Sequence, residues 1–161
     1  MTKLYINTVE ALMILGLAVM VALTFLSTAI RFVPGYGGIF WAEEVTRYIS
    51  IWVVFLGAGL GVRFGIHLSV DLVVAMLPHT VARILLLVCF CLMLVFEAVL
   101  VWYGTSLTIS NYAQQSASLR MHMSYAYAAI PVGGFIMLCE TIRLIIRELR
   151  GLPREHGVLA D

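Results

Sequence analysis

Glu97 is the residue whose type and position most suggest chemistry, because it is a carboxylate inside the apolar run 81–102. An ionised carboxylate deep in a membrane costs a few kcal/mol, so Glu97 should face protein, water or a cation. A proton or ion relay needs more than one such group, which favours a structural role over ion transport. We predict Arg47 as its partner and expect neutralisation of Glu97 to impair folding or assembly.

Cysteines and histidines could bind a metal ion or a haem, but their positions argue against both. Cys89 and Cys91 are about 200° apart on a helix, so they cannot form a local clamp. A membrane haem usually takes axial ligands from facing helices within the core. The histidines instead fall at edges or in loops: His67, His79, His122 and His156. We therefore expect this chain to bind no metal or other cofactor. We also expect that it is not an enzyme, because the sequence brings together no nucleophile and no pair of acidic residues.

The elements that must position these residues are membrane spans. Of the 161 residues, 62% are hydrophobic and only 12% are charged, which departs strongly from globular usage. Four runs are long enough to cross a bilayer, and the first exceeds a cleaved signal region. The sequence predicts an all-α integral membrane protein with four transmembrane helices. It is a single membrane domain over 1–161, with spans at about 11–30, 45–62, 81–102 and 125–146 and a cytoplasmic tail at 147–161.

The placement of basic residues predicts the topology. Seven of the ten lie on one side of the spans: Lys3, Arg63, Arg83, Arg143, Arg147, Arg150 and Arg154. The other three, Arg31, Arg47 and Arg120, lie on the opposite side. The positive-inside rule then puts both termini in the cytoplasm. Membrane lipids are expected partners of the Arg-rich tail, and nucleic acid is not.

The segment from Trp41 to Asp71 has an acidic entry and a basic exit around its span. Glu43 and Glu44 suit the first turn of a helix, where carboxylates are stabilised by unpaired backbone N–H groups. They could equally form an exposed contact for a partner, and the sequence leaves both roles open. Arg63, His67 and Asp71 follow at four-residue spacing. The segment from Ser69 to Pro78, which includes Asp71, predicts a short helix in the membrane interface between spans two and three.

Small residues at four-residue spacing predict faces where helices pack closely. Gly57, Gly61 and Gly65 form one such stripe, and Ala129 with Gly133 forms another. Pro131 should kink the fourth span. Near the end of that span, Glu140 and Arg143 are three apart and should pair.

These features together resemble the small, DctQ-type membrane subunit of tripartite ATP-independent periplasmic (TRAP) transporters. The similarity covers nearly the whole chain. Its central part is Trp41-Ala42-Glu43-Glu44, Arg47-Tyr48, Trp52, Phe55-Leu56-Gly57-Ala58, Arg63, Gly65, His67 and Val70-Asp71. Leu119-Arg120 and Ala129-Ile130-Pro131-Val132-Gly133 extend it.

The resemblance implies a scaffold for another protein's transport, in the bacterial inner membrane. In this family a large multi-spanning subunit performs sodium-coupled transport, so Na⁺ is expected there, and a periplasmic binding protein delivers an organic anion. Trp41, Glu43, Glu44 and Arg47 would form the periplasmic partner interface. Arg63, His67 and Asp71 would mark the cytoplasmic boundary.

Two other classes remain open at this point. A small four-helix multidrug or cation exporter also has a membrane carboxylate, but we would expect it in the first span, and 11–30 has none. A membrane anchor of a redox complex would need histidines in the core. The transported substrate is open among C4-dicarboxylates, 2-oxo acids, sugar acids and sialic acid.

Overall fold

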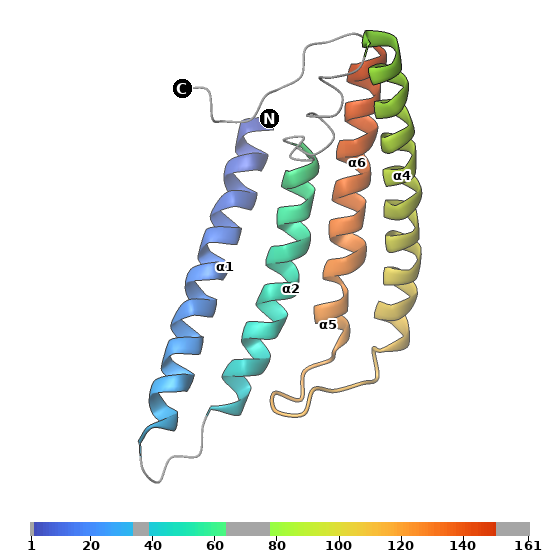
Figure 1. Ribbon diagram of the computed structural model, residues 1–161. Coiled ribbons are helices and arrows are strands. Elements are labelled where there is room, and N and C mark those ends of the chain that lie inside the picture. Colours follow the sequence, from blue (N-terminus) through green and yellow to red (C-terminus); the bar gives the residue numbers. More distant parts are fainter. Residues whose placement is uncertain (1, 34–38, 64–77, 151–161) are drawn as a thin grey trace, which may run out of the picture.

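The chain is almost entirely helical over residues 2–33, 39–63 and 78–150, which the computed structural model describes (Figure 1). Its helices are α1 (Thr2–Arg31), α2 (Phe40–Arg63), α4 (His79–Ser110), α5 (Ser124–Tyr127) and α6 (Ala129–Leu149). Four stretches are long and apolar enough to cross a membrane: Leu4–Arg31, Phe40–Arg63, Thr80–Ser110 and Ser124–Leu149. The predicted fold class is confirmed. The predicted interfacial helix, with Gly65, His67 and Asp71, lies outside the described residues.

The long helices form a single layer in the spatial order α1, α2, α6, α4 (Figure 1). Helix α2 contacts α1 on one side and α6 on the other, and α6 in turn contacts α4. The edge helices α1 and α4 do not contact each other within the described residues. Because the layer is not closed into a bundle, it has two broad faces, and many large apolar side chains stay exposed on the isolated chain. Such surface suits lipid or another membrane protein.

The layer has two ends that differ in chemistry. At one, which we call the Arg63 end, α2 and α6 finish and α1 and α4 begin (Figure 1). There Arg83 donates to the carbonyl oxygens of Glu148 and Leu149 at 3.3 and 3.4 Å, which satisfies acceptors that the end of α6 leaves open. At the other, the Trp41 end, α2 begins and residues 111–123 connect α4 to α5.

Glycines bring the helices of this layer close together. Each of the three helix contacts has one glycine on either side: Gly16 and Gly57 between α1 and α2, Gly59 and Gly133 between α2 and α6, and Gly104 and Gly134 between α4 and α6. Gly61, which we predicted to lie in a packing stripe, has no described residue within 4 Å of an added Cβ. Gly59 was not predicted to pack, but a Cβ there would lie 2.6 Å from Ile136 Cγ2.

The fourth span is interrupted near Pro131, as a proline predicts. Helix α5 ends at Tyr127 and α6 begins at Ala129, so the break falls at Ala128. The residue four before Pro131 is Tyr127, whose carbonyl can receive no hydrogen bond from the proline nitrogen. Ala129, also predicted to pack, is completely buried in the first turn of α6.

Candidate functional site

Glu44 holds the loop between α4 and α5. Its Oε2 accepts hydrogen bonds from the backbone N–H groups of Ser118 and Leu119, at 3.1 and 3.0 Å. Two donors on one carboxylate oxygen form a charge-assisted pair of bonds. The sequence left open whether this residue caps a helix or contacts a partner. The structure gives it a third role, since it anchors the loop 111–123 of its own chain to the start of α2.

Replacing Glu44 by alanine is expected to loosen this loop. Because both amides lose a charged acceptor, the N–H groups of Ser118 and Leu119 should exchange with solvent several-fold faster. Hydrogen–deuterium exchange of the full chain in detergent measures this. The matched control is Glu43→Ala, which removes the neighbouring carboxylate and should leave both amides unchanged. Equal protection in Glu44→Ala and the wild type would contradict the anchor.

Glu43 and the other predicted interface residues lie at the surface of the Trp41 end. Glu43 Oε1 accepts from Arg31 Nη2 at 3.1 Å, and both side chains are more than half exposed. Such an exposed pair contributes little stability. Trp41 and Arg47 are exposed as well. Glu43 therefore connects the ends of α1 and α2, while Trp41 and Arg47 stay accessible from outside the chain.

Trp52 provides a second polar contact between α2 and the start of the fourth span. Its indole Nε1–H donates to the backbone oxygen of Tyr125 in α5, at 3.1 Å. The break before Pro131 leaves carbonyl groups of α5 without the usual helical donor, and a buried or lipid-facing carbonyl needs such a partner. This role of Trp52 was not predicted, although the residue belongs to the motif that suggested the family.

A buried ion pair links α2 to α6 near the Arg63 end. Arg63 Nη1 donates to Glu140 Oε1 at 2.9 Å, and the Arg63 side chain is only 6% exposed. Arg143 Nε lies 3.0 Å from Glu140 Oε2, so the predicted local pair of Glu140 and Arg143 is confirmed. The guanidinium of Arg63 also lies 5.7 Å from the ring centre of Tyr5 on α1, within range of a cation–π contact. Arg63 thus joins three helices, a role that its predicted place at the cytoplasmic boundary did not indicate.

Glu97 is buried between α4 and α6. It is 2% exposed, and its Oε1 accepts a hydrogen bond of 2.8 Å from the hydroxyl of Thr141, which is fully buried. The predicted partner, Arg47, is on α2, and α2 does not contact α4 among the described residues. Thr141 therefore replaces Arg47 as the partner of this carboxylate. The contact places Glu97 inside the protein layer, as the cost of exposing it to lipid requires.

Thr141→Val is expected to destabilise the contact between α4 and α6. It keeps the shape of the side chain but removes the donor, which costs about 1–3 kcal/mol when a buried acceptor loses its hydrogen bond. Glu97→Gln keeps an acceptor oxygen and should lose less than Glu97→Ala. Thermal unfolding of the full chain in mild detergent, followed by fluorescence, checks both. A Thr141→Val protein as stable as the wild type would show that this hydrogen bond is unimportant.

The described residues contain no cluster of three or more histidine, cysteine or acidic side chains that could hold a metal ion. The three cysteines are free thiols. His122 stacks on Tyr112 with ring centres 4.9 Å apart, and its Nδ1 lies 2.7 Å from the carbonyl oxygen of Tyr112. His122 therefore has a structural role in the loop 111–123. His67 and His156 lie outside the described residues.

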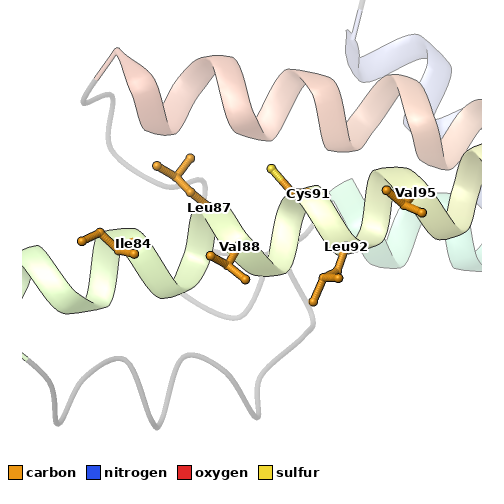
Figure 2. A pocket seen from close by; sticks show the side chains of 6 residues that line it. All are labelled: Ile84, Leu87, Val88, Cys91, Leu92 and Val95. Carbon is orange, nitrogen blue, oxygen red and sulfur yellow. The ribbon is translucent and has the colours of Figure 1, made fainter.

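The exposed surface of α4 has an open apolar hollow of about 350 Å³. Figure 2 shows side chains projecting from successive turns of α4, and those that line the hollow are Ile84, Leu87, Val88, Cys91, Leu92 and Val95. Five are hydrocarbon and one is a thiol, so the lining offers little to orient a polar solute. Its chemistry matches a lipid chain or an apolar side chain better than a transported anion.

Comparison with known proteins decides the family. The model of the family described as "Tripartite ATP-independent periplasmic transporters, DctQ component" matches residues 20–151. The chain belongs to this family. It is therefore a TRAP transporter small permease subunit, as the residues of the Trp41–Asp71 segment predicted. None of these comparisons supports the exporter or the redox anchor.

Individual relatives agree with the family assignment. A putative TRAP transporter small permease protein of Haemophilus influenzae is 33% identical, over 88% of each chain. The C4-dicarboxylate TRAP transporter small permease protein DctQ of Rhodobacter capsulatus is 28% identical over 73% of this chain, which spans 54% of that relative's length. The isethionate TRAP transporter permease protein DctMQ of Oleidesulfovibrio alaskensis is 25% identical over 83% of this chain but matches in only 22% of its own length.

The motif residues on α2 mainly make contacts within the small permease subunit. Glu44, Trp52 and Arg63 bind the loop, α5 and α6, respectively. Phe55 lies against Gly133, and Gly57 lies against Met13 of α1. The described part of the motif thus fixes α2 in the middle of the layer. Sequence spacing alone could not show this, because the partners of α2 are distant in the chain.

Proposed function

We propose that this chain is the scaffolding subunit of a sodium-coupled TRAP transporter. It anchors the static part of a large multi-spanning subunit in the bilayer and contributes to the surface on which a periplasmic binding protein docks. The observation that carries the proposal is the match to a small part of the longer DctMQ permease protein, where a relative of this chain is continuous with further sequence. A unit that occurs joined to another in one polypeptide is a natural partner of the same unit encoded separately.

The architecture of the layer supports a scaffolding role. Its three helix contacts combine glycine packing with buried polar contacts at Arg63 and Glu97, which together favour one fixed arrangement. Many large apolar side chains of the described helices are exposed, so the layer has apolar surface for lipid and for a membrane partner. A rigid plate of this shape is suited to hold a neighbour in position.

The proposal includes an orientation in the bacterial inner membrane. Both termini and the Arg63 end would be cytoplasmic, and the Trp41 end would be periplasmic, because most basic residues flank the Arg63 end. Reporter fusions at Gly37 and at the C-terminus test this. A periplasmic C-terminus would refute the orientation.

The transported solute would be an organic anion. Two relatives carry names that refer to C4-dicarboxylate and to isethionate, which are both organic anions. The coupling Na⁺ would bind to the large subunit, and this chain would bind no cofactor of its own. Selection of the solute would belong to the binding protein.

Reconstitution tests the proposed function. The chain is co-expressed with the large membrane subunit of the same transporter, and the purified pair is placed in liposomes with the binding protein of that transporter. Uptake of labelled organic anions is expected only when all three proteins and an inward Na⁺ gradient are present. Full uptake without this chain, or failure of the two membrane subunits to purify together, would refute the scaffolding role.

A further inference from the structure

Arg120 stands at the tip of the loop between α4 and α5 in an unusual backbone conformation. Its φ is 52°, which makes it the one non-glycine residue with positive φ in the described structure. A side chain with a Cβ disfavours this region, and arginine gains no local hydrogen bond there as asparagine can. The side chain is exposed. The conformation persists because the surrounding loop determines it.

The loop on which Arg120 stands is braced from several sides. Ser116 N–H donates to Met121 O at 2.8 Å and Met123 N–H donates to Gln114 O at 2.9 Å, which closes the loop at its base. Glu44 holds the two residues before Arg120 by their N–H groups. The stack of His122 on Tyr112 joins the two ends of the loop to each other. The Arg120 backbone is therefore held in place before any partner binds.

Both carboxylates of the Trp41 end are already engaged. Glu43 pairs with Arg31, and Glu44 binds the loop while Arg47 adds a favourable charge beside it. Arg120 forms no ion pair in the described part of the chain, and no other acidic residue lies near this end in the sequence. The tip of the loop thus presents a guanidinium without a counter-charge.

We propose that Arg120 is a docking contact of this chain for an acidic patch on the soluble binding protein. The partner's identity rests on the proposed function, and the contact itself rests on the loop. A guanidinium binds carboxylates through two parallel hydrogen bonds, and this geometry benefits from a fixed backbone. Lipid headgroups are mobile and need no such positioning, so the braced loop favours a protein partner. In this proposal Glu43 and Glu44 make contacts within the chain, and the guanidinium of Arg120 contacts the binding protein.

Binding measurements test this assignment. The complex of this chain with its large subunit is placed in nanodiscs, and the affinity for the purified binding protein is measured at several salt concentrations. Arg120→Asn removes the charge but tolerates the positive φ, and it should weaken binding about 10- to 30-fold and reduce its salt dependence. Arg120→Lys keeps the charge but lacks the paired N–H groups of a guanidinium, so its affinity should lie between those of the wild type and Arg120→Asn. Arg31→Gln is the matched control, because it removes an exposed positive charge from the same end, and it should change affinity less than about twofold.

Several outcomes would overturn the Arg120 contact. One is an Arg120→Asn complex that binds like the wild type, and another is an equal loss in Arg31→Gln, which would indicate general charge attraction. A loss that disappears when anionic lipid is replaced by zwitterionic lipid would indicate a membrane contact instead. A wild-type complex that does not bind the binding protein would refute the proposed docking function itself, and the contact with it.

Discussion

Glu140→Ala is expected to lower the stability of the helix layer by about 3–5 kcal/mol, because it leaves a buried arginine without its counter-charge. Arg63 is 6% exposed and lies between α2 and α6, where water cannot replace the lost carboxylate. The nearby Tyr5 ring, 5.7 Å from the guanidinium, compensates only weakly. Thermal unfolding of the full chain in mild detergent should show an earlier transition. Arg63→Ala should have a smaller effect, because Glu140 keeps Arg143 as a partner.

Two controls separate the buried pair from a general loss of charge. Arg143→Ala removes the second arginine of Glu140, but its side chain is 30% exposed, so the loss should stay below about 1 kcal/mol. The double variant Arg63→Met with Glu140→Leu removes both buried charges and should recover most of the stability. If Glu140→Ala unfolds at the wild-type temperature, or if the double variant is as unstable as Glu140→Ala, the pair is not a buried electrostatic contact.

The spans and the local pairs could be predicted from the sequence because they depend on neighbouring residues. An apolar run predicts a membrane helix, and the three-residue spacing of Glu140 and Arg143 predicts a contact on one helix face. The partners of Glu97 and Arg63 could not be found this way. The prediction of Arg47 rested on the depth of Glu97 along its span, whereas α6 lies between α2 and α4 in the layer. Only the order of helices in space reveals that Thr141 and Glu140 are the facing residues.

The glycines of α2 show the same limit. Four-residue spacing correctly identifies residues on one helix face, but a helix in the middle of a layer packs on two opposite sides. Gly57 faces Met13 of α1, while Gly59 faces Ile136 of α6. Two residues along a helix correspond to about 200°, so these glycines serve opposite contacts. A stripe search built on Gly57 and Gly61 therefore misses Gly59, and the spacing becomes informative only once α2 is known to have two neighbours.

Gly133→Ala is expected to force α2 and α6 apart. A Cβ at this position would lie 2.5 Å from Phe55 Cβ and 3.0 Å from the Phe55 carbonyl oxygen. Neither atom can move without the backbone of α2, in contrast to the flexible end of a long side chain. Overpacking of this kind costs about 1–3 kcal/mol. Alanine is a better helix former than glycine by about 1 kcal/mol, which by itself would stabilise the variant. We expect the loss of stability from overpacking to appear in spite of this gain.

A series of glycine variants makes this prediction sharp. Gly61→Ala has the same change in helix propensity, but its Cβ would meet no described residue within 4 Å, so the isolated chain should keep or slightly gain stability. Gly57→Ala would meet the terminal Cε of Met13 at 2.9 Å, which can move aside, so its loss should be intermediate. Thermal unfolding should therefore rank Gly61→Ala above Gly57→Ala and both above Gly133→Ala. If Gly133→Ala is as stable as Gly61→Ala, close backbone approach does not hold α2 against α6. Phe55→Ala should rescue Gly133→Ala only in part, because it removes Phe55 Cδ1 at 3.0 Å but keeps the Cβ at 2.5 Å and the carbonyl oxygen at 3.0 Å.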